Sequence, residues 1–584
     1  MVVDVIPGII SLAVTVGIIA LIASAARRRG PGVDAHSVRR FFQYAVLYAL
    51  VIVVALGVAE LLGRAFGAEV PEWQDQSIEL ARGLAFAIVG GALLVLLAWW
   101  TRRMHRADPA ETESPLWVAY LTLATLTGAA VAATSVQSTG FMLFADGRFD
   151  GGSAATFLAW TAVWWVHWEI ARRSLDKAQQ TIHLLLGSLI GLAFSAAGLV
   201  MTLGTSLDLL IRPETLGKPL GALGEGVATL VVGALLWVRY WVTAAIRLPR
   251  RGLWLAYVLP LGVGGGLVMA LVAGSRLLWS VLVWFFGDRR DASWSIHFHS
   301  AALELAALLV GILVWWYHRS VLGSGEMQGA GRTEPQRVYE YLVAGISLVA
   351  AAIGVGTLLV TLIEAVTPGV DAGLPVVNTL WAAVTLLVVG VPVWWVFWRR
   401  VSRAAVLDPT AEAASPARRV YLAVLFGLAG VAAVIALITA AVSLMQDIVA
   451  GSLGPATVRS MRYALGTLVG AAAVSAYHGA VFRQDRASGP AMRERGPRTI
   501  LLIGGVGPDV DRELSRATRA KVEVWGRLDV PVPDWDVAVL AEELSAFPDA
   551  DVVVVSESQG HRIVVVDPSG RRAFAEPEPA VPVP

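Results

Sequence analysis

The chain has 584 residues, of which 56% are hydrophobic and only 16% are charged. Soluble domains carry about 25% charged residues, so this composition excludes an ordinary water-soluble protein and indicates a membrane protein. The net charge of +1 argues against nucleic-acid binding, and the lack of cysteine excludes disulfides, thiolate nucleophiles, zinc–cysteine sites and iron–sulfur clusters.

The first apolar segment, residues 5–25, is long enough to cross a bilayer. Asp4 precedes it, and Arg27, Arg28 and Arg29 follow it, which reverses the charge order of a cleavable signal peptide. We therefore expect residues 1–36 to form an uncleaved transmembrane anchor with a basic loop, and the N-terminus to lie outside.

The remaining apolar segments come in pairs, each segment long enough to span a membrane as a helix. The pairs are 42–62 with 80–100, 116–134 with 153–170, 182–203 with 223–244, 253–275 with 298–317, 338–363 with 377–397, and 420–445 with 460–481. The sequence thus predicts an all-α polytopic membrane protein of about 13 transmembrane helices, with six tandem hairpins in residues 37–483.

The second helix of each pair ends in a related box, and the boxes recur every 65–81 residues. Their members are Trp99, Trp100, Arg102, Trp164, Trp165, His167, Trp237, Arg239, Trp315, Trp316, His318, Trp394, Trp395, Tyr477 and His478. Four of the first helices carry an acid near the other end, at Glu60, Asp208, Glu364 and Asp447. Six copies of one hairpin explain both regularities.

Basic residues are concentrated in the loops that follow the second helices, for example Arg102, Arg103, Arg399 and Arg400. The loops inside the hairpins hold fewer of them. By the positive-inside rule, the hairpin tips face outward, and the boxes, the connections between hairpins and the C-terminus are cytoplasmic. We expect a multi-pass protein of the cell inner membrane.

The Trp-Trp-x-His/Arg box and the starts Val38-Arg39-Arg40-Phe41-Phe42 and Arg418-Arg419-Val420-Tyr421 resemble a known family. The family consists of bacterial membrane proteins built from tandem copies of a domain of unknown function. The resemblance covers residues 37–483. It implies the repeat but no activity, so no catalytic residue follows from it.

Acids inside a membrane are costly and are usually functional. Glu304 lies about two turns into its predicted span, and the outer acids lie near Arg82, Arg276 and Arg462. Ion pairs that fix the hairpin tips are one interpretation, and a proton or cation path through Glu304 is the other.

Pro260, Gly264 and Gly265 lie in a proline- and glycine-rich stretch, which marks either a substrate-binding helix break or tight packing.

The histidines allow several further hypotheses. His167, His318 and His478 are predicted to share one depth in the membrane. With the tryptophans they form either an interfacial belt or, together with Arg102 and Arg239, an inner vestibule that binds an anionic head group or a cofactor; haem ligation is the least favoured hypothesis. His297 and His299 have the i, i+2 spacing that disfavours a metal site on a helix. We expect no cofactor and no metal.

The C-terminal part alternates between strand-like and amphipathic segments. We expect a linker at 484–497, a small cytoplasmic β-α-β-α-β-β domain at 498–570 and a proline-rich disordered tail at 571–584. Gly504-Gly505-Val506-Gly507 follows the first strand, but without a Walker lysine an ordinary turn is favoured over a phosphate site. The domain is a candidate for binding a protein partner or a second copy.

No enzymatic signature is present, and two function classes remain. The number of spans and Glu304 favour a small-solute or ion permease. The alternative is a non-transporting scaffold or sensor that acts through its C-terminal domain, favoured by the parallel repeats and the scarcity of polar residues at mid-membrane. Apart from the lipid bilayer, the sequence identifies no partner.

Overall fold

The computed structural model describes residues 35–566 except 69–75, 109–110, 148, 213–217, 251, 290–292, 324–332, 368, 370–373, 410–411, 413–414, 489–496, 505–509, 519, 527–535, 549 and 558–559. The predicted anchor at 5–25, most of the linker and the predicted tail at 571–584 lie outside the described residues.

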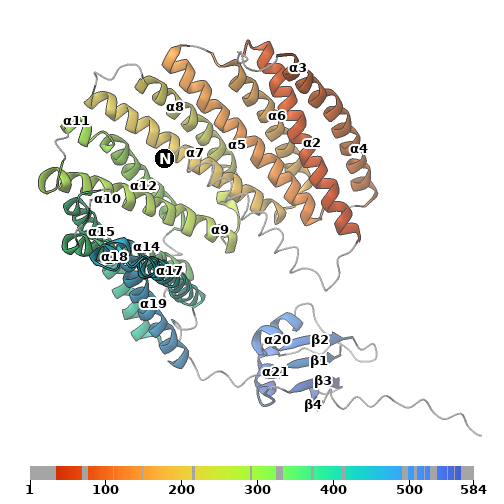
Figure 1. Cartoon of the computed structure of the whole chain (residues 1–584). Coiled ribbons are helices and arrows are strands. Elements are labelled where there is room, and N and C mark those ends of the chain that lie inside the picture. Colours follow the sequence, from red (N-terminus) through yellow and green to blue (C-terminus); the bar gives the residue numbers. More distant parts are fainter. Residues whose placement is uncertain are drawn as a thin grey trace, which may run out of the picture. The chain divides into compact units, whose positions relative to one another are not determined.

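All six predicted hairpins are present as pairs of helical segments (Figure 1). The first three pairs are α2 (Ala35–Ala65) with α3 (Gln76–Ala85), η1 (Phe86–Gly90) and α4 (Gly91–Ala107); α5 (Pro115–Asp146) with α6 (Gly151–Ser174); and α7 (Gln179–Ile211) with α8 (Lys218–Trp237), η4 (Val238–Val242) and η5 (Ala245–Arg247). The last three are α9 (Gly252–Ala256), η6 (Tyr257–Gly264) and α10 (Gly265–Phe286) with α11 (Trp294–His297) and α12 (Ala301–Val321); α14 (Glu334–Val366) with α15 (Val376–Leu407); and α17 (Pro416–Val449) with α18 (Pro455–Ser460) and α19 (Arg462–Ser488). The segments η1, η4 and η6 are π-helical.

Eleven helices of the described residues are long and apolar enough to cross a membrane, so the chain is a multi-pass membrane protein by length and composition. The sequence predicted thirteen spans. The anchor is not described, and α6 does not count among the eleven. Trp164, Trp165, His167 and Glu169 crowd the second half of α6 and lower its hydropathy.

Successive hairpins pack by one rule: the first helix of each pair contacts its own partner and also the second helix of the next pair. Thus α2 contacts α6, α5 contacts α8, and α7 contacts α12. On α10, Trp279 Nε1 donates to the carbonyl of Asn378 on α15 at 3.0 Å. The hairpins therefore follow one another in chain order, an arrangement that the sequence left open.

Glycines permit the closest of these contacts. A Cβ on Gly140 of α5 would lie 2.5 Å from the carbonyl oxygen of Gly224 on α8. A Cβ on Gly356 of α14 would lie 2.7 Å from the carbonyl oxygen of Gly466 on α19. In lipid the hydrophobic effect does not bring helices together, because lipid tails are as apolar as the side chains. Small residues at such crossings let the two backbones pack closely, and this packing favours helix association.

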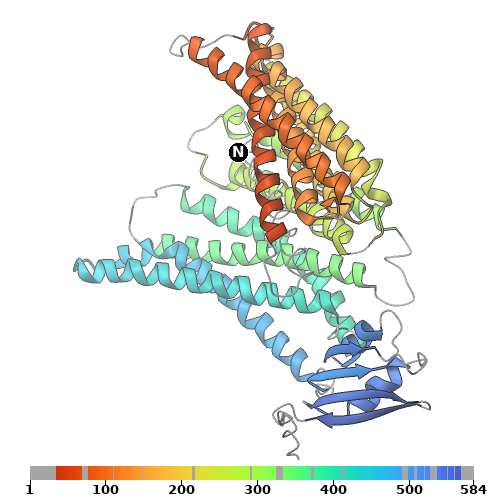
Figure 2. The same cartoon turned by 90° about the vertical axis from the view of Figure 1, so that its right-hand side faces the viewer.

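The C-terminal domain has the predicted order of elements: β1 (Thr499–Ile503), α20 (Val510–Thr518), β2 (Lys521–Trp525), α21 (Val537–Leu544), β3 (Asp551–Glu557) and β4 (Gly560–Val566). The four strands form one sheet in the order β2-β1-β3-β4, as labelled in Figure 1, and Figure 2 shows the sheet after a turn of 90°. The pairs β1–β2 and β1–β3 are parallel, and β3–β4 is antiparallel.

One face of this sheet carries the core of the domain. Ile500, Leu502, Val552 and Val554 are buried there with Leu514 of α20 and with Leu540 and Leu544 of α21. The alternate residues point to the opposite face, which we term the open face. Its apolar members are Leu501, Ile503, Trp525, Val553, Val555, Val564 and Val566, all of them half-buried or exposed, and the same rows contain the polar residues Thr499, Lys521, Glu523, Asp551 and Arg562.

Candidate functional site

Tyrosine and histidine meet inside five of the six hairpins, at the ends where the boxes lie. In four of them, a tyrosine near the start of the first helix faces a histidine near the end of the second. The pairs are Tyr44 with His105, Tyr120 with His167, Tyr257 with His318, and Tyr421 with His478. The repeat therefore specifies a contact as well as a helix length.

The second hairpin defines the geometry best. His167 Nδ1 lies 2.8 Å from the carbonyl oxygen of Val163, and its Nε2 lies 2.8 Å from the Tyr120 hydroxyl. A carbonyl only accepts hydrogen bonds, so Nδ1 carries the proton and the Tyr120 hydroxyl donates to Nε2. This fully bonded, neutral histidine has no free coordinating nitrogen, which does not suit a haem ligand.

The third and fourth hairpins depart from this pattern. In the third, the residues are exchanged: His183 is on α7 and Tyr240 is on the second helix, with ring centroids 5.7 Å apart. His183 is buried, and neither ring nitrogen has a hydrogen-bond partner in the described residues. In the fourth, His318 Nδ1 bonds the carbonyl of Val314 at 2.8 Å, whereas its buried Nε2 is unpaired in the same part of the chain.

Tryptophan–tyrosine hydrogen bonds join the second helices of neighbouring hairpins. In each bond the indole nitrogen donates to a phenol oxygen at 2.9 Å. The pairs are Trp164 with Tyr240, Trp241 with Tyr317, and Trp398 with Tyr477. The boxes therefore connect hairpins two to three, three to four, and five to six.

Three of the four double tryptophans divide into an inner and an outer member, whereas Trp99 and Trp100 of the first box are both exposed. Trp165, Trp316 and Trp395 are each more than half exposed, whereas Trp164, Trp315 and Trp394 are half-buried. Arginines one turn further lie over these rings, with Arg319 over Trp315 and Arg399 over Trp395. This is the environment expected at a membrane interface, where the ring lies in lipid and the guanidinium reaches the head groups.

The histidines of the boxes lie deeper than the sequence indicated. His167, His318 and His478 are buried, each against the first helix of its own hairpin. Arg102 is exposed, and Arg239 lies over the Trp168 ring at 4.1 Å. Each histidine thus has its nearest aromatic partner inside its own hairpin, an arrangement unlike the shared vestibule that we considered.

A buried carboxylate holds the loop between the first two hairpins against α2. Glu111, in the loop between α4 and α5, is 2% exposed and forms ion pairs with Arg39 and Arg40 of α2, the latter at 2.9 Å. Arg39 also donates to Gln43, which in turn donates to Thr101. We term these residues the Glu111 cluster.

Burial alone would raise the pKa of Glu111, but the hydrogen bond and charge of Arg40, together with the charge of Arg39, outweigh it and lower the pKa below its ordinary value. The carboxylate is therefore ionised at neutral pH and serves as the counter-charge of two guanidinium groups.

Sequence reasoning missed this carboxylate, although the chain carries the same motif twice. Asp108-Pro109 is followed by Glu111 and Ser114-Pro115, and Asp408-Pro409 is followed by Glu412 and Ser415-Pro416. In both loops the glutamate and the serine are buried. In both, the glutamate N–H donates to the aspartate carbonyl at 3.1 Å, and the serine N–H donates to the glutamate carbonyl. The signal was an internal repeat in the loops, outside the apolar segments.

Three of the predicted acids are paired with the arginines named from the sequence. Glu60 accepts from Arg82 at 3.1 Å, Glu304 from Arg276 at 2.8 Å, and Glu364 from Arg462 at 2.7 Å. Glu304 lies in the first turn of α12, because the chain turns between α11 and α12. It is buried and also accepts from Ser300 at 3.0 Å. Asp447 on α17 has no ion pair with a described residue.

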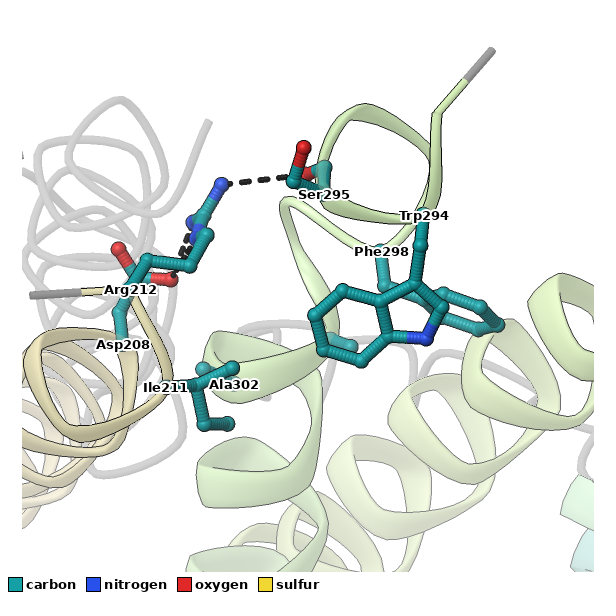
Figure 3. Close-up of a pocket in the computed structure, with 8 residues that line it drawn as sticks. Asp208, Ile211, Arg212, Trp294, Ser295, Phe298 and Ala302 are labelled. Atoms are coloured by element: carbon teal, nitrogen blue, oxygen red, sulfur yellow. Dashed lines mark hydrogen bonds and ion pairs between the residues drawn. The ribbon is translucent and has the colours of Figure 1, made fainter. Parts of the chain in front are cut away.

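A cleft of about 260 Å³ lies beside Asp208, the remaining predicted acid (Figure 3). Asp208 pairs with Arg212 at its edge, and Arg212 donates to the carbonyls of Ser295 and His299. Trp294, Phe298 and Ile211 contribute apolar surface to the lining. The cleft lies where the tip of the third hairpin meets that of the fourth. The lining of the cleft therefore combines apolar side chains with an ion pair whose two members already have partners in the protein.

The proline- and glycine-rich stretch is a π-helical segment and not an unwound one. Pro260 lies within η6, where the wider turn accommodates the missing N–H. Gly262 approaches His318 so closely that a Cβ would lie 2.4 Å from the ring, and Gly264 faces Leu342 of α14. Gly265 has open space around it. Tight packing therefore explains Gly262 and Gly264.

Two other predicted features are the histidine pair His297 and His299, which make local contacts, and the glycine turn, most of which lies outside the described residues. His297 contacts the carbonyl of Ser280 at 2.9 Å, and His299 that of Ile296 at 2.8 Å. Of the glycine turn, only Gly504 is described, and its N–H donates to the Trp525 carbonyl.

Sequence reasoning also passed over Glu225, which lies near the start of the span Leu220–Arg247. Its side chain forms no hydrogen bond or ion pair with the described residues. Its flanking glycines, Gly224 and Gly226, contact α5 and α7. An acid without a counter-charge inside a span is a functional candidate by the criterion that we applied to Glu304.

Comparison with known proteins adds one finding. The model of a family described as Domain of unknown function (DUF5671) matches residues 40–150 and 337–480. Each matched segment contains one copy of the Asp-Pro…Glu…Ser-Pro loop. The double match agrees with a repeated domain of unassigned role. No curated protein matches the chain, and no solved structure does.

Proposed function

We propose that the chain is a non-transporting membrane scaffold whose bundle anchors the C-terminal domain and whose open face binds a protein partner. The open face carries the proposal. Sheets with parallel strands are normally covered on both faces, but here α20 and α21 cover only one. Trp525 is 57% exposed on the other. An exposed apolar patch on a polar-rimmed domain marks an interaction site.

The bundle supports the same proposal. Glu304, the best candidate for an ion path, is neutralised by Arg276, and Glu60 and Glu364 are neutralised likewise. The Tyr–His pairs and Trp–Tyr bonds fix the opposite ends of the hairpins. A bundle held at both ends suits an anchor better than a carrier, whose helices must rearrange around a bound substrate.

We further propose that the chain has about 13 spans and lies in the inner membrane of a bacterium, with the N-terminus outside and the C-terminal domain in the cytoplasm. The excess of Arg and Lys in the loops between hairpins supports this orientation. Cysteines introduced at Glu113 and at Asp150, in a chain that has none of its own, would be labelled by an impermeant thiol reagent from opposite sides.

The test of the scaffold proposal is site-specific photo-crosslinking in intact membranes. A photoreactive amino acid at Val553, on the open face, is expected to capture a protein. The control position is Val539, which is 48% exposed on α21. Capture from neither Val553 nor Leu501, or equal capture from Val539, would overturn the proposal.

Glu225 favours a second candidate function, a small-solute or ion permease. An unneutralised carboxylate between two glycines at a helix crossing is a feature that transport sites share. The matched test compares Glu225→Gln with Glu304→Gln in reconstituted vesicles. Loss of a proton or cation flux in Glu225→Gln alone would favour the permease over the scaffold.

A further inference from the structure

The open face of the C-terminal domain is complementary to itself. We propose that it binds the open face of a second copy of this chain, so that two domains form a face-to-face sandwich about a twofold axis. This inference rests on the proposed function, because it names the partner that the scaffold binds. Most homo-oligomers are twofold dimers in which one patch meets its own copy.

The strand register determines which residues would meet. Leu501, Glu523, Val553 and Val564 occupy one row across the sheet. The row two residues further contains Ile503, Trp525, Val555 and Arg562. A twofold axis parallel to the strands places β2 over β4 of the second copy and β1 over its β3. Leu501 then faces Val553, and Ile503 faces Val555, so apolar residues meet in the centre.

The edges favour the same axis. Trp525 of one copy then lies over Arg562 of the other, an arrangement suited to a cation–π contact. Glu523 lies one row away, roughly 7 Å along the strand, within reach of the same guanidinium. A twofold axis perpendicular to the strands would instead stack β2 on its own copy, and an axis through the first row would place Glu523 against Glu523. Charge complementarity therefore favours the axis parallel to the strands.

The size of the face explains why the full chain matters. Four strands about 4.8 Å apart and five residues long give a face of roughly 300 Å² per copy. Stable complexes bury about 800 Å² per partner. Confinement of both copies to one membrane raises their effective concentration and favours a contact that the free domain would form only weakly.

Thiol crosslinking tests the inference, because every thiol in the chain would be an introduced one. Facing sheets pack about 10 Å apart, too far for a direct disulfide, so a short membrane-permeant bis-maleimide is used to bridge the gap. Two differently tagged full-length chains, one with Leu501→Cys and the other with Val553→Cys, are co-expressed and treated with it in membranes. We expect a crosslinked dimer carrying both tags. The matched control replaces Val553→Cys by Val539→Cys, an exposed valine on α21, and should give no dimer.

A charge-exchange series adds an independent readout. Arg562→Glu should lower the yield of crosslinked dimer several-fold, and Glu523→Arg combined with Arg562→Glu should restore it. Equal thiol crosslinking with the Val539 control, or no thiol crosslinking at all, would overturn self-association. If photo-crosslinking from Val553 still captured another protein in that case, the scaffold proposal would stand with a different partner. Loss of both signals would overturn both.

Discussion

Replacement of Glu111 by glutamine tests whether the Glu111 cluster holds the loop between the first two hairpins against the first hairpin. The side chain of Glu111 is 3% exposed, whereas those of Arg40 and Arg39 are 14% and 27% exposed. Glu111→Gln keeps the size but removes the charge that both guanidinium groups face. Removal of one partner from a buried ion pair costs about 3–5 kcal/mol.

Two features reduce that cost here. A glutamine oxygen can still accept one hydrogen bond, and both arginines can extend their head groups to water. We therefore expect a loss of about 2–3 kcal/mol in the free energy of unfolding at neutral pH, at the low end for a broken buried pair. Tryptophan fluorescence during thermal unfolding in detergent would report it as a melting temperature lower by several degrees.

The control is Glu113→Gln, two residues away and exposed, which should change the free energy of unfolding by less than about 0.5 kcal/mol. Because the pKa of Glu111 is lowered in the folded state, the contribution of its charge is present above the ordinary pKa of a glutamate and is lost as the pH falls through the lowered one. The two variants should therefore converge in acid. Equal melting temperatures at neutral pH would refute the role of the cluster.

Three other variants have clear expected outcomes. Tyr120→Phe leaves His167 Nε2 without a hydrogen-bond donor and should lower the free energy of unfolding by about 1 kcal/mol. Tyr257→Phe should lower it less, because His318 Nε2 receives no such hydrogen bond. The melting temperatures of the two variants compare these effects. Hydrogen bonds from Arg498 and Thr499 lower the pKa of Asp551. The stabilising charge of Asp551 is therefore present above the ordinary pKa of an aspartate and is lost as the pH falls through the lowered pKa. Asp551→Asn should weaken the C-terminal domain at neutral pH but not in strong acid, and protease resistance measures the difference. Glu225→Gln should leave vesicle ion fluxes unchanged if the chain does not transport.

The sequence predicted the helices well because their signal is local. Apolar length and the positions of polar loops gave all six pairs, and the alternation of DVVVVSE and HRIVVVD gave β3 and β4. Pairing of Glu60, Glu304 and Glu364 with Arg82, Arg276 and Arg462 was one of two interpretations, and the ion pairs are present.

Burial around the boxes could not be predicted in the same way. A histidine beside two tryptophans suggests an interface, but hydropathy does not say which side of a helix faces its neighbour. His167 is buried against Tyr120, which lies 47 residues earlier in the chain and forms a hydrogen bond with it. Glu111 was missed for a related reason, since its partners Arg39 and Arg40 are more than 70 residues distant. Such contacts depend on the order in which hairpins pack, which becomes visible only in the fold.

The regular contacts also identify a junction at which the pattern between hairpins changes. Trp–Tyr bonds join hairpins two to three, three to four, and five to six, but among the described residues none joins four to five. At that junction the first helix of the fourth hairpin contains the π-helical η6 with Pro260, and His318 retains an unpaired buried nitrogen. π-Helical turns and unpaired buried polar groups are both costly and persist where packing or function requires them. The second family match also begins just beyond this point, at residue 337. The fourth and fifth hairpins are therefore fastened by a different set of contacts: Asn378 of α15 exchanges hydrogen bonds with Asp288 and accepts one from Trp279, and Arg319 lies over the Tyr339 ring.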